Sequence, residues 1–136
     1  MAPDLRVGLA PALLVKLDAL MARMAAVGHP MKICQGLRTA EYQHSLYLYG
    51  HDGNPGKIRT NCDGYVVKSN HQAAGDGLGH AVDLCFLGND PFGPTQPWAT
   101  FGAIAQAEGL RWGGTYKIVD LDHVEMPYLP LPAHAV

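Results

Sequence analysis

Three candidate metal ligands lie on segments that are well separated along the chain, and their separation constrains the fold most. His71 and Asp83 belong to the stretch 69–84, and His123 belongs to a second stretch, 120–125. Two imidazoles and one carboxylate, with a fourth position left for water, form the donor set of a catalytic rather than a structural zinc site. If these side chains bind one Zn²⁺ ion, the chain must fold so that both stretches meet at a single site.

The same stretches carry motifs that resemble a known peptidase family. The matching residues occur in the order Gly36-x-Arg38-Thr39 with Gln43, Ser69-x-His71, Gly79-x-Ala81-x-Asp83 and Asp120-x-x-His123. This pattern resembles the LAS zinc metallopeptidases. Within that family it is most similar to the branch of D-alanyl-D-alanine carboxypeptidases and phage L-alanyl-D-glutamate endopeptidases, which cut the stem peptides of peptidoglycan.

The resemblance covers residues 33–127 and implies both a fold and a cofactor. The fold would be a hedgehog/D-Ala-D-Ala-peptidase-like α+β fold, and the cofactor one Zn²⁺ ion held by His71, Asp83 and His123. One departure from the family pattern is a longer connection between His71 and Gly79. We expect this Ala- and Gly-rich insert, residues 72–78, to bulge beside the site.

The family pattern also implies roles for residues around the ligands. Asp120 corresponds to the general base, which takes a proton from water and passes it to the leaving amine. Strand alternation places Glu125, rather than Asp120, on the face of His123. We therefore expect Asp120 on a turn before the strand, with Glu125 as a reserve base or a hydrogen-bond partner of an imidazole. Arg38 is expected to bind developing negative charge or a carboxylate, because a guanidinium stays charged.

Three other side chains are candidates for substrate binding or for support of the site. Ser69 would orient the first motif or a substrate group, and Gln43 matches the helix that follows Arg38 in the family. Trp112 would line the substrate groove, although an aromatic residue in the core is an equally good interpretation. We interpret the remaining histidines outside the motifs as ordinary polar residues: His29, His44, His51 and His134.

Chain length and charge narrow the function classes. The 136 residues predict a single catalytic domain, 1–136, which we expect to be a monomer. Ten Lys and Arg against twelve Asp and Glu give a net charge of −2. Because nucleic-acid-binding domains normally carry a basic stripe, this balance argues against a nucleic-acid partner. The expected partner is a peptidoglycan stem peptide.

The cysteines and the N-terminal residues bear on the compartment. Cys34, Cys62 and Cys85 are odd in number and show no pairing pattern, so we expect reduced thiols in a reducing compartment. Residues 1–6 lack the features of a signal peptide, and no apolar run approaches the length of a membrane span. We therefore expect the protein to accumulate in the cytoplasm and to act on the cell wall after release.

Hydrophobic periodicity predicts three helices and several short strands around the motifs. The helices are expected at 9–27, 40–49 and 98–108, the second of them capped by Thr39. Strands are expected at 31–35, 65–68, 79–87 and 123–126, with a hairpin formed by 110–114 and 117–119. In strand 79–87, His80 would point away from the metal if Asp83 faces it. The pattern predicts α+β, with a small antiparallel sheet that carries the zinc site.

These observations leave three functional hypotheses. The leading one is a zinc-dependent peptidoglycan stem-peptide hydrolase, specifically a phage endolysin-type L-alanyl-D-glutamate endopeptidase. The second is a D-alanyl-D-alanine carboxypeptidase or dipeptidase with the same chemistry. The third is a non-catalytic zinc-bearing binding module, against which the presence of Arg38 and Asp120 argues.

Overall fold

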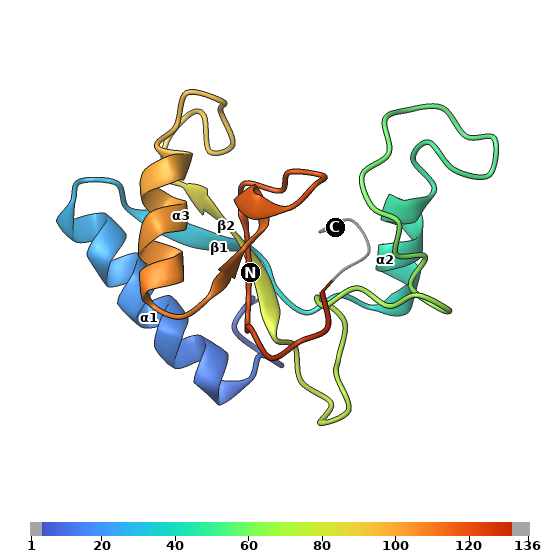
Figure 1. Cartoon of the computed structure of the whole chain (residues 1–136), viewed down its shortest axis with the longest axis horizontal. Helices are drawn as coiled ribbons and strands as arrows, with labels where there is room; N and C mark the ends of the chain where they lie inside the picture. Colours follow the sequence, from blue (N-terminus) through green and yellow to red (C-terminus); the bar gives the residue numbers. More distant parts are fainter. Residues whose placement is uncertain (1–3, 132–136) are drawn as a thin grey trace.

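The computed structural model describes residues 4–131, and this part of the chain has an α+β fold (Figure 1). Its helices are α1 (Pro11–Ala26), α2 (Ala40–Tyr47) and α3 (Trp98–Ala107). Its strands are β1 (Met31–Gln35), β2 (Ala81–Phe86), β3 (Arg111–Trp112) and β4 (His123–Glu125). The strands pair antiparallel in the order β1-β2-β4-β3. The predicted fold class, with three helices and a small antiparallel sheet, is confirmed for the described residues.

The helix α1 packs against α3 and the sheet, and its sequence explains both its length and its buried face (Figure 1). Pro11 is accommodated in the first turn, where its missing N–H costs no hydrogen bond. Gly28 follows the helix with φ of 88°, a conformation that glycine adopts without steric cost. The apolar residues spaced three and four apart are fully buried: Leu13, Leu17, Leu20 and Met24.

The strand β2 is the centre of the sheet and positions the first half of the site. All six of its residues are buried, as expected for a strand with a neighbour on each side. Asp83 is opposite His123 of β4 on one side and opposite Gln35 of β1 on the other. Pairing between β2 and β4 therefore brings together two of the three predicted ligands, although they are forty positions apart in sequence.

The helix α2 lies apart from α1 and α3, next to the loop that follows it (Figure 1). The side chain of Thr39 accepts a hydrogen bond from the backbone N–H of Tyr42 at 3.1 Å, so the predicted N-cap is confirmed. Gln43 and Leu46 form its buried face. No helix within residues 4–131 is long and apolar enough to cross a membrane.

The strand predicted at 65–68 is wrong. The carboxylate of Asp63 accepts hydrogen bonds from the backbone N–H groups of Tyr65, Val66 and Val67, at 2.8–3.1 Å. These contacts fold the backbone around one side chain instead of leaving the N–H groups for a strand partner. Val66 is 88% exposed, so this apolar residue does not belong to the core.

The hairpin predicted from 110–114 and 117–119 is also wrong. Only Arg111 and Trp112 form a strand, β3, and their partner is β4. A 3₁₀ turn, Gly113–Thr115, follows directly, and the segment 116–120 is irregular. Arg111 and Trp112 are opposite Glu125 and Val124, so the partner of this strand lies beyond the segment 117–119.

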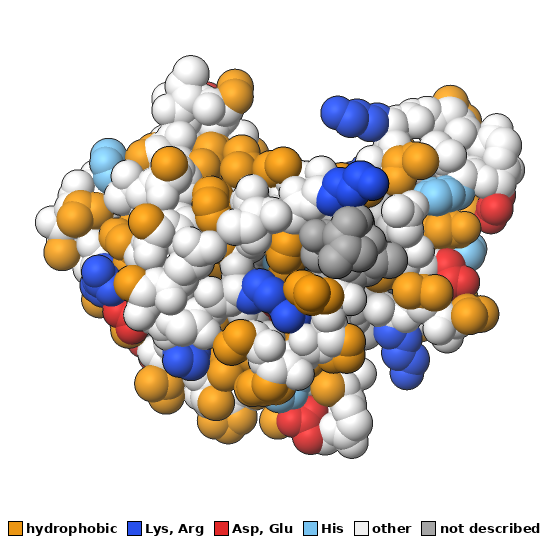
Figure 2. Space-filling model, viewed as in Figure 1, with side chains coloured by type: hydrophobic (Ala, Val, Ile, Leu, Met, Phe, Trp, Pro, Cys, Tyr) orange, Lys and Arg blue, Asp and Glu red, His pale blue; other side chains and the backbone are white. Residues whose placement is uncertain are grey.

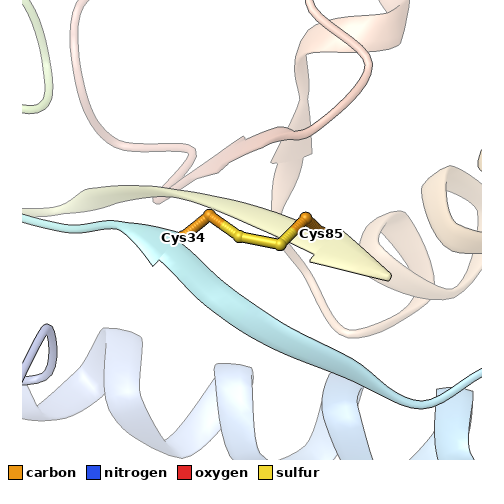
Figure 3. The surroundings of a disulfide bond; sticks show 2 residues. All are labelled: Cys34 and Cys85. Atoms are coloured by element: carbon orange, nitrogen blue, oxygen red, sulfur yellow. A yellow bond between two sulfur atoms is a disulfide. The ribbon is translucent and has the colours of Figure 1, made fainter. Parts of the chain in front are cut away.

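The expectation of three reduced thiols is wrong for two of the cysteines. Cys34 of β1 and Cys85 of β2 form a disulfide between neighbouring strands (Figure 3). Their Cα atoms are 6.0 Å apart, within the usual range for a bridged pair. Cys62 is a buried free thiol. The pairing depends on the β1–β2 register, which the 51-residue separation of the two cysteines does not reveal.

Candidate metal centre

The three predicted ligands meet in one buried cluster. His71 Nε2 and His123 Nδ1 are 3.0 Å apart, and each lies 3.2 Å from Asp83 Oδ1. Asp83 comes from β2, His123 from the start of β4, and His71 from the loop before β2. The three residues are 2–7% exposed. Residues distant in sequence thus present two nitrogens and one oxygen to a common point.

The outer nitrogen of each imidazole, which faces away from the cluster, is hydrogen-bonded to an acceptor. These hydrogen bonds determine which ring nitrogen carries the proton. His71 Nδ1 donates to the carbonyl of Gly36 at 3.2 Å. His123 Nε2 donates to the carboxylate of Glu125 at 2.7 Å. In each neutral ring the proton is on the outer nitrogen, so the nitrogen that faces the cluster carries a lone pair.

With both rings neutral, three acceptors, the two inner nitrogens and Asp83 Oδ1, face one another with no donor between them. Such a group is satisfied only by a cation or an added proton. Their separations of 3.0–3.2 Å are close to the ligand spacing of about 3.3 Å in a tetrahedron with bonds of about 2.0 Å, the usual Zn–N distance. The residues present fit a zinc ion with His71, Asp83 and His123 as its protein ligands.

The pKa shifts of the three residues also indicate that the cluster favours a positive charge. Burial keeps the pKa of His71 below its ordinary value, despite the attraction of Asp83. Burial also opposes a charge on His123, but hydrogen bonds to Asp83 and Glu125 outweigh it and raise the pKa of His123 to about 10. Burial would raise the pKa of Asp83, but the two imidazoles hold it well below its usual range.

Glu125 is a fully buried carboxylate with four different donors around it. Its oxygens accept hydrogen bonds from His123 Nε2, from Asn70 Nδ2 at 2.7 Å, from Tyr116 Oη at 2.8 Å, and from the guanidinium of Arg111. Burial would raise the pKa of Glu125, but the hydrogen bond and charge of His123, with the hydrogen bonds from Arg111 and Tyr116, lower it to about 2. The carboxylate is therefore charged, and it fixes the orientation of the His123 ring.

Arg38 is directed at the metal ligand Asp83. Its Nη2 donates to Asp83 Oδ2 at 3.1 Å and to Gln35 Oε1 at 2.9 Å, and its Nη1 donates to Gln43 Oε1 at 3.0 Å. The Nε atom is buried and has no partner among the described residues. Three of the five N–H groups thus hold Arg38 in place, and its charge neutralises the carboxylate that faces the metal position.

Gln43 and Ser69 support neighbouring parts of the site. Gln43 is fully buried, and its amide nitrogen donates to the carbonyl of Cys62 at 3.0 Å while its oxygen accepts from Arg38. The hydroxyl of Ser69 accepts a hydrogen bond from the backbone N–H of His71 at 3.2 Å. Ser69 therefore shapes the turn that presents His71.

Asp120 lies on a turn before β4, in the place expected from strand alternation. Its carbonyl accepts from the backbone N–H of His123 at 3.2 Å, and its carboxylate is 3.8 Å from His123 Nδ1. The side chain is 43% exposed, so it reaches both the cluster and solvent. The turn is packed tightly against Gly113, whose backbone carbonyl accepts from the N–H of Asp120 at 2.9 Å.

Asp122 is a residue that sequence reasoning passed over. Its carboxylate lies close to those of Asp83 and Asp120. Burial, the charge of Asp83 and a hydrogen bond with Asp120 raise the pKa of Asp122 to about 9. The sequence feature that could have indicated this residue is the pair Asp120 and Asp122 on either side of Leu121. Strand alternation alone does not predict that these two carboxylates lie close to each other.

A cavity of about 340 Å³ opens in front of the cluster. Figure 2 shows the surface hollowed between the part that carries α2 with its loop and the part that carries the sheet, with Lys and Arg side chains at the edge of the hollow. The cavity wall contains the three candidate ligands together with Arg38, Arg59, Asp120 and Asp122. The volume is at the lower end of the range of small-molecule sites and suits a short peptide segment.

Trp112 and the 72–78 insert lie outside the cavity wall. The indole of Trp112 donates to the carbonyl of Leu121 at 2.7 Å and packs against Gly102 of α3. The insert closes as a tight turn, with the N–H of Gly77 bonded to the carbonyl of Ala74. His80, as expected, points away from the cluster and contacts Asp76 and Tyr128. His134 lies outside the described residues.

The fold is similar to those of solved peptidases. The L-Ala D-Glu endopeptidase ChiX of Serratia marcescens aligns with a TM-score of 0.63 and 20% identity, covering 92% of this chain and 84% of its own. The LD-carboxypeptidase LdcB aligns with a TM-score of 0.57 and 21% identity, covering 91% and 68%. The L,D-carboxypeptidase DacB of Streptococcus pneumoniae aligns with a TM-score of 0.56 and 20% identity, covering 90% and 68%.

The chain shares their fold. The α+β fold expected from the motifs, like that of hedgehog/D-Ala-D-Ala-peptidase-like structures, is thus confirmed. No protein-family model matches the chain. Because the similar structures include an endopeptidase as well as carboxypeptidases, the likeness does not distinguish the two branches.

Proposed function

We propose that the protein is a zinc-dependent hydrolase of peptidoglycan stem peptides, and specifically an endolysin-type L-alanyl-D-glutamate endopeptidase. The observation that carries the proposal is the cluster of His71, Asp83 and His123, whose three inward atoms can hold a cation and face an open cavity. The fold likeness to ChiX and to LdcB, the latter described with peptidoglycan recognition, supports the substrate class.

The proposed roles of the side chains follow from their positions. Zinc bound here would lower the pKa of a water molecule to about 7 and polarise the scissile carbonyl. Asp120, partly exposed and 3.8 Å from His123 Nδ1, is positioned to accept a proton inside the cavity and to return it to the leaving amine. Arg38 holds Asp83, and its remaining Nη1 N–H group can face negative charge that develops on the substrate.

The bond that is cut is tested by digestion of purified peptidoglycan with the zinc-loaded protein, followed by mass spectrometry. An endopeptidase of the proposed specificity creates fragments with a new N-terminal D-glutamate. Release of D-alanine instead identifies the carboxypeptidase alternative. The endolysin role predicts in addition that the protein lyses permeabilised Gram-negative cells, that a chelator stops lysis, and that added zinc restores it.

A catalytic protein and a zinc-bearing binding module differ in the effect of one substitution. Asp120→Ala removes the proposed base but none of the three ligands, so we expect loss of wall lysis with zinc content still near one ion per chain. The zinc content is measured by elemental analysis of the dialysed protein. Unchanged lysis by this variant would reject the role of Asp120, and absence of turnover by the fully loaded wild type would favour the binding module.

A further inference from the structure

Two guanidinium groups, those of Arg38 and Arg59, line the cavity in front of the candidate metal centre, and they differ in their hydrogen bonds to the rest of the chain. Arg38 is 12% exposed and is held by Asp83, Gln35 and Gln43. Arg59 is exposed and, among residues 4–131, has no hydrogen bond or ion pair. Its one specific contact is with the ring of Tyr49, whose centroid lies 5.1 Å from the guanidinium carbon. Arg59 thus offers all five of its N–H groups to a ligand.

The loop that carries Arg59 is connected to the metal centre by buried and partly buried hydrogen bonds. The next residue, Thr60, is 7% exposed, and its carbonyl accepts from His51 Nε2 at 3.0 Å. Thr60 Oγ1 accepts from the amide of Gln43 at 3.4 Å, and Gln43 in turn accepts from Arg38. A continuous set of contacts therefore runs from Asp83 through Arg38 and Gln43 to the backbone beside Arg59.

The cation–π contact with Tyr49 limits the positions that the Arg59 side chain can take. This contact uses none of the hydrogen-bonding capacity of the guanidinium, because the attraction is between the charge and the ring face. The N–H edge of the guanidinium is the part that pairs with a carboxylate through two parallel hydrogen bonds. The charge, the free donors and the position in the cavity wall all suit a planar anion.

We propose that Arg59 recognises a free carboxylate of the substrate and so sets the specificity of the site. This inference rests on the proposed function. When a D-glutamate residue is linked onward through its side-chain carboxyl group, its α-carboxylate stays free and is attached to the carbon that bears the scissile nitrogen. Arg59 pairs with this group and places the amide in front of His71, Asp83 and His123. It acts in binding and takes no part in proton transfer.

The experiment compares two synthetic stem peptides that differ only in this group, one with the free α-carboxylate and one with the α-carboxamide. Cleavage of the L-Ala–D-Glu bond by the zinc-loaded protein is followed by liquid chromatography, and kcat/KM is determined for each peptide. We expect the wild type to prefer the carboxylate by about tenfold or more, the value of a charge-assisted pair. Arg59→Gln should lose this preference, mainly through KM, whereas Arg59→Lys should keep part of it.

Lys57→Gln is the matched control, because Lys57 is an exposed cation on the same loop that does not line the cavity. This variant should keep the full preference, which separates a local contact from the general charge of the loop. A full preference in Arg59→Gln, or no preference in the wild type, would overturn the role of Arg59 while leaving the proposed hydrolase intact. Failure of the wild type to cleave either peptide would instead count against the proposed function.

Discussion

At the scale of single residues, Glu125 is the side chain on which the order of the metal centre most depends. It is fully buried, and within residues 4–131 the His123 ring that it orients has no other hydrogen-bond partner on its outer nitrogen. Glu125→Gln keeps the size of the side chain but presents an amide to four donors. We expect zinc affinity to fall by about 10- to 100-fold, the usual effect of losing such a ligand-orienting group.

Competition titration with a zinc-binding dye measures the effect at Glu125. Glu108→Gln is a suitable control, because Glu108 pairs with Arg23 at the surface and touches none of the candidate ligands. Equal zinc affinity in Glu125→Gln and in the wild type would show that His123 is oriented without Glu125.

Gly113 is a second residue whose identity the site requires. A Cβ atom at this position would lie 2.3 Å from the carbonyl oxygen of Asp120 and 3.1 Å from Cβ of His123. Gly113→Ala must therefore displace the turn that carries the proposed base, at a cost of about 1–3 kcal/mol in the free energy of unfolding. Urea denaturation measures this cost. Gly75→Ala, where a Cβ meets nothing within 4 Å, should change stability by less than about 0.5 kcal/mol.

Residue patterns could predict the candidate ligands but not their supports. His71, Asp83 and His123 stand in recognisable motifs, and strand alternation correctly placed Asp120 on a turn and Glu125 beside His123. Arg111 and Tyr116 belong to no motif, because their contacts with Glu125 arise only when β3 and the turn after it pack beside β4. Their own positions in the sequence carry no sign of those partners.

At the scale of elements, the disulfide between β1 and β2 is a covalent tie directly beside the site. Cys34 belongs to the cavity wall, and Cys85 is two residues from Asp83. The disulfide closes a loop between cysteines that are 51 residues apart. In the chain-entropy model, closing a loop of this length contributes about 4 kcal/mol to the free energy of unfolding. We expect reduction, or the double substitution Cys34→Ala/Cys85→Ala, to lower the free energy of unfolding by about 2–4 kcal/mol.

Urea denaturation with and without a phosphine reductant tests this prediction. Cys62→Ala should still respond to the reductant, because Cys62 is not bridged, and the double variant should not. Alkylation of the unreduced, denatured protein should label one cysteine of the three. Labelling of all three would contradict the disulfide.

The elements themselves were predictable where a long apolar pattern determines them. The stripe of α1 and the buried strand β2 have strong periodicity, and both were found. The segments 65–68 and 117–119 have apolar residues but no buried face. In the first of them, hydrogen bonds to Asp63 determine the backbone conformation. Short apolar runs of this kind do not distinguish a strand from an exposed loop.

At the scale of the whole molecule, the metal centre joins the loop before β2 to two strands of the sheet. His71 lies in the loop region next to α2, whereas Asp83 and His123 lie in the sheet that α1 and α3 cover. Zinc that binds only when all three are together stabilises the folded chain over the unfolded one. At a free concentration 100 times the dissociation constant, this linkage contributes about 2.7 kcal/mol.

Thermal unfolding with zinc and with a chelator should therefore give a higher Tm in zinc, and the gap should widen as zinc concentration rises. His71→Ala should abolish the gap, because it removes one of three ligands and leaves the sheet intact. His29→Ala, at an exposed position after α1, should retain it. A Tm that is independent of zinc in the wild type would mean that these side chains satisfy one another with a proton, and the proposed metal chemistry would lose its basis.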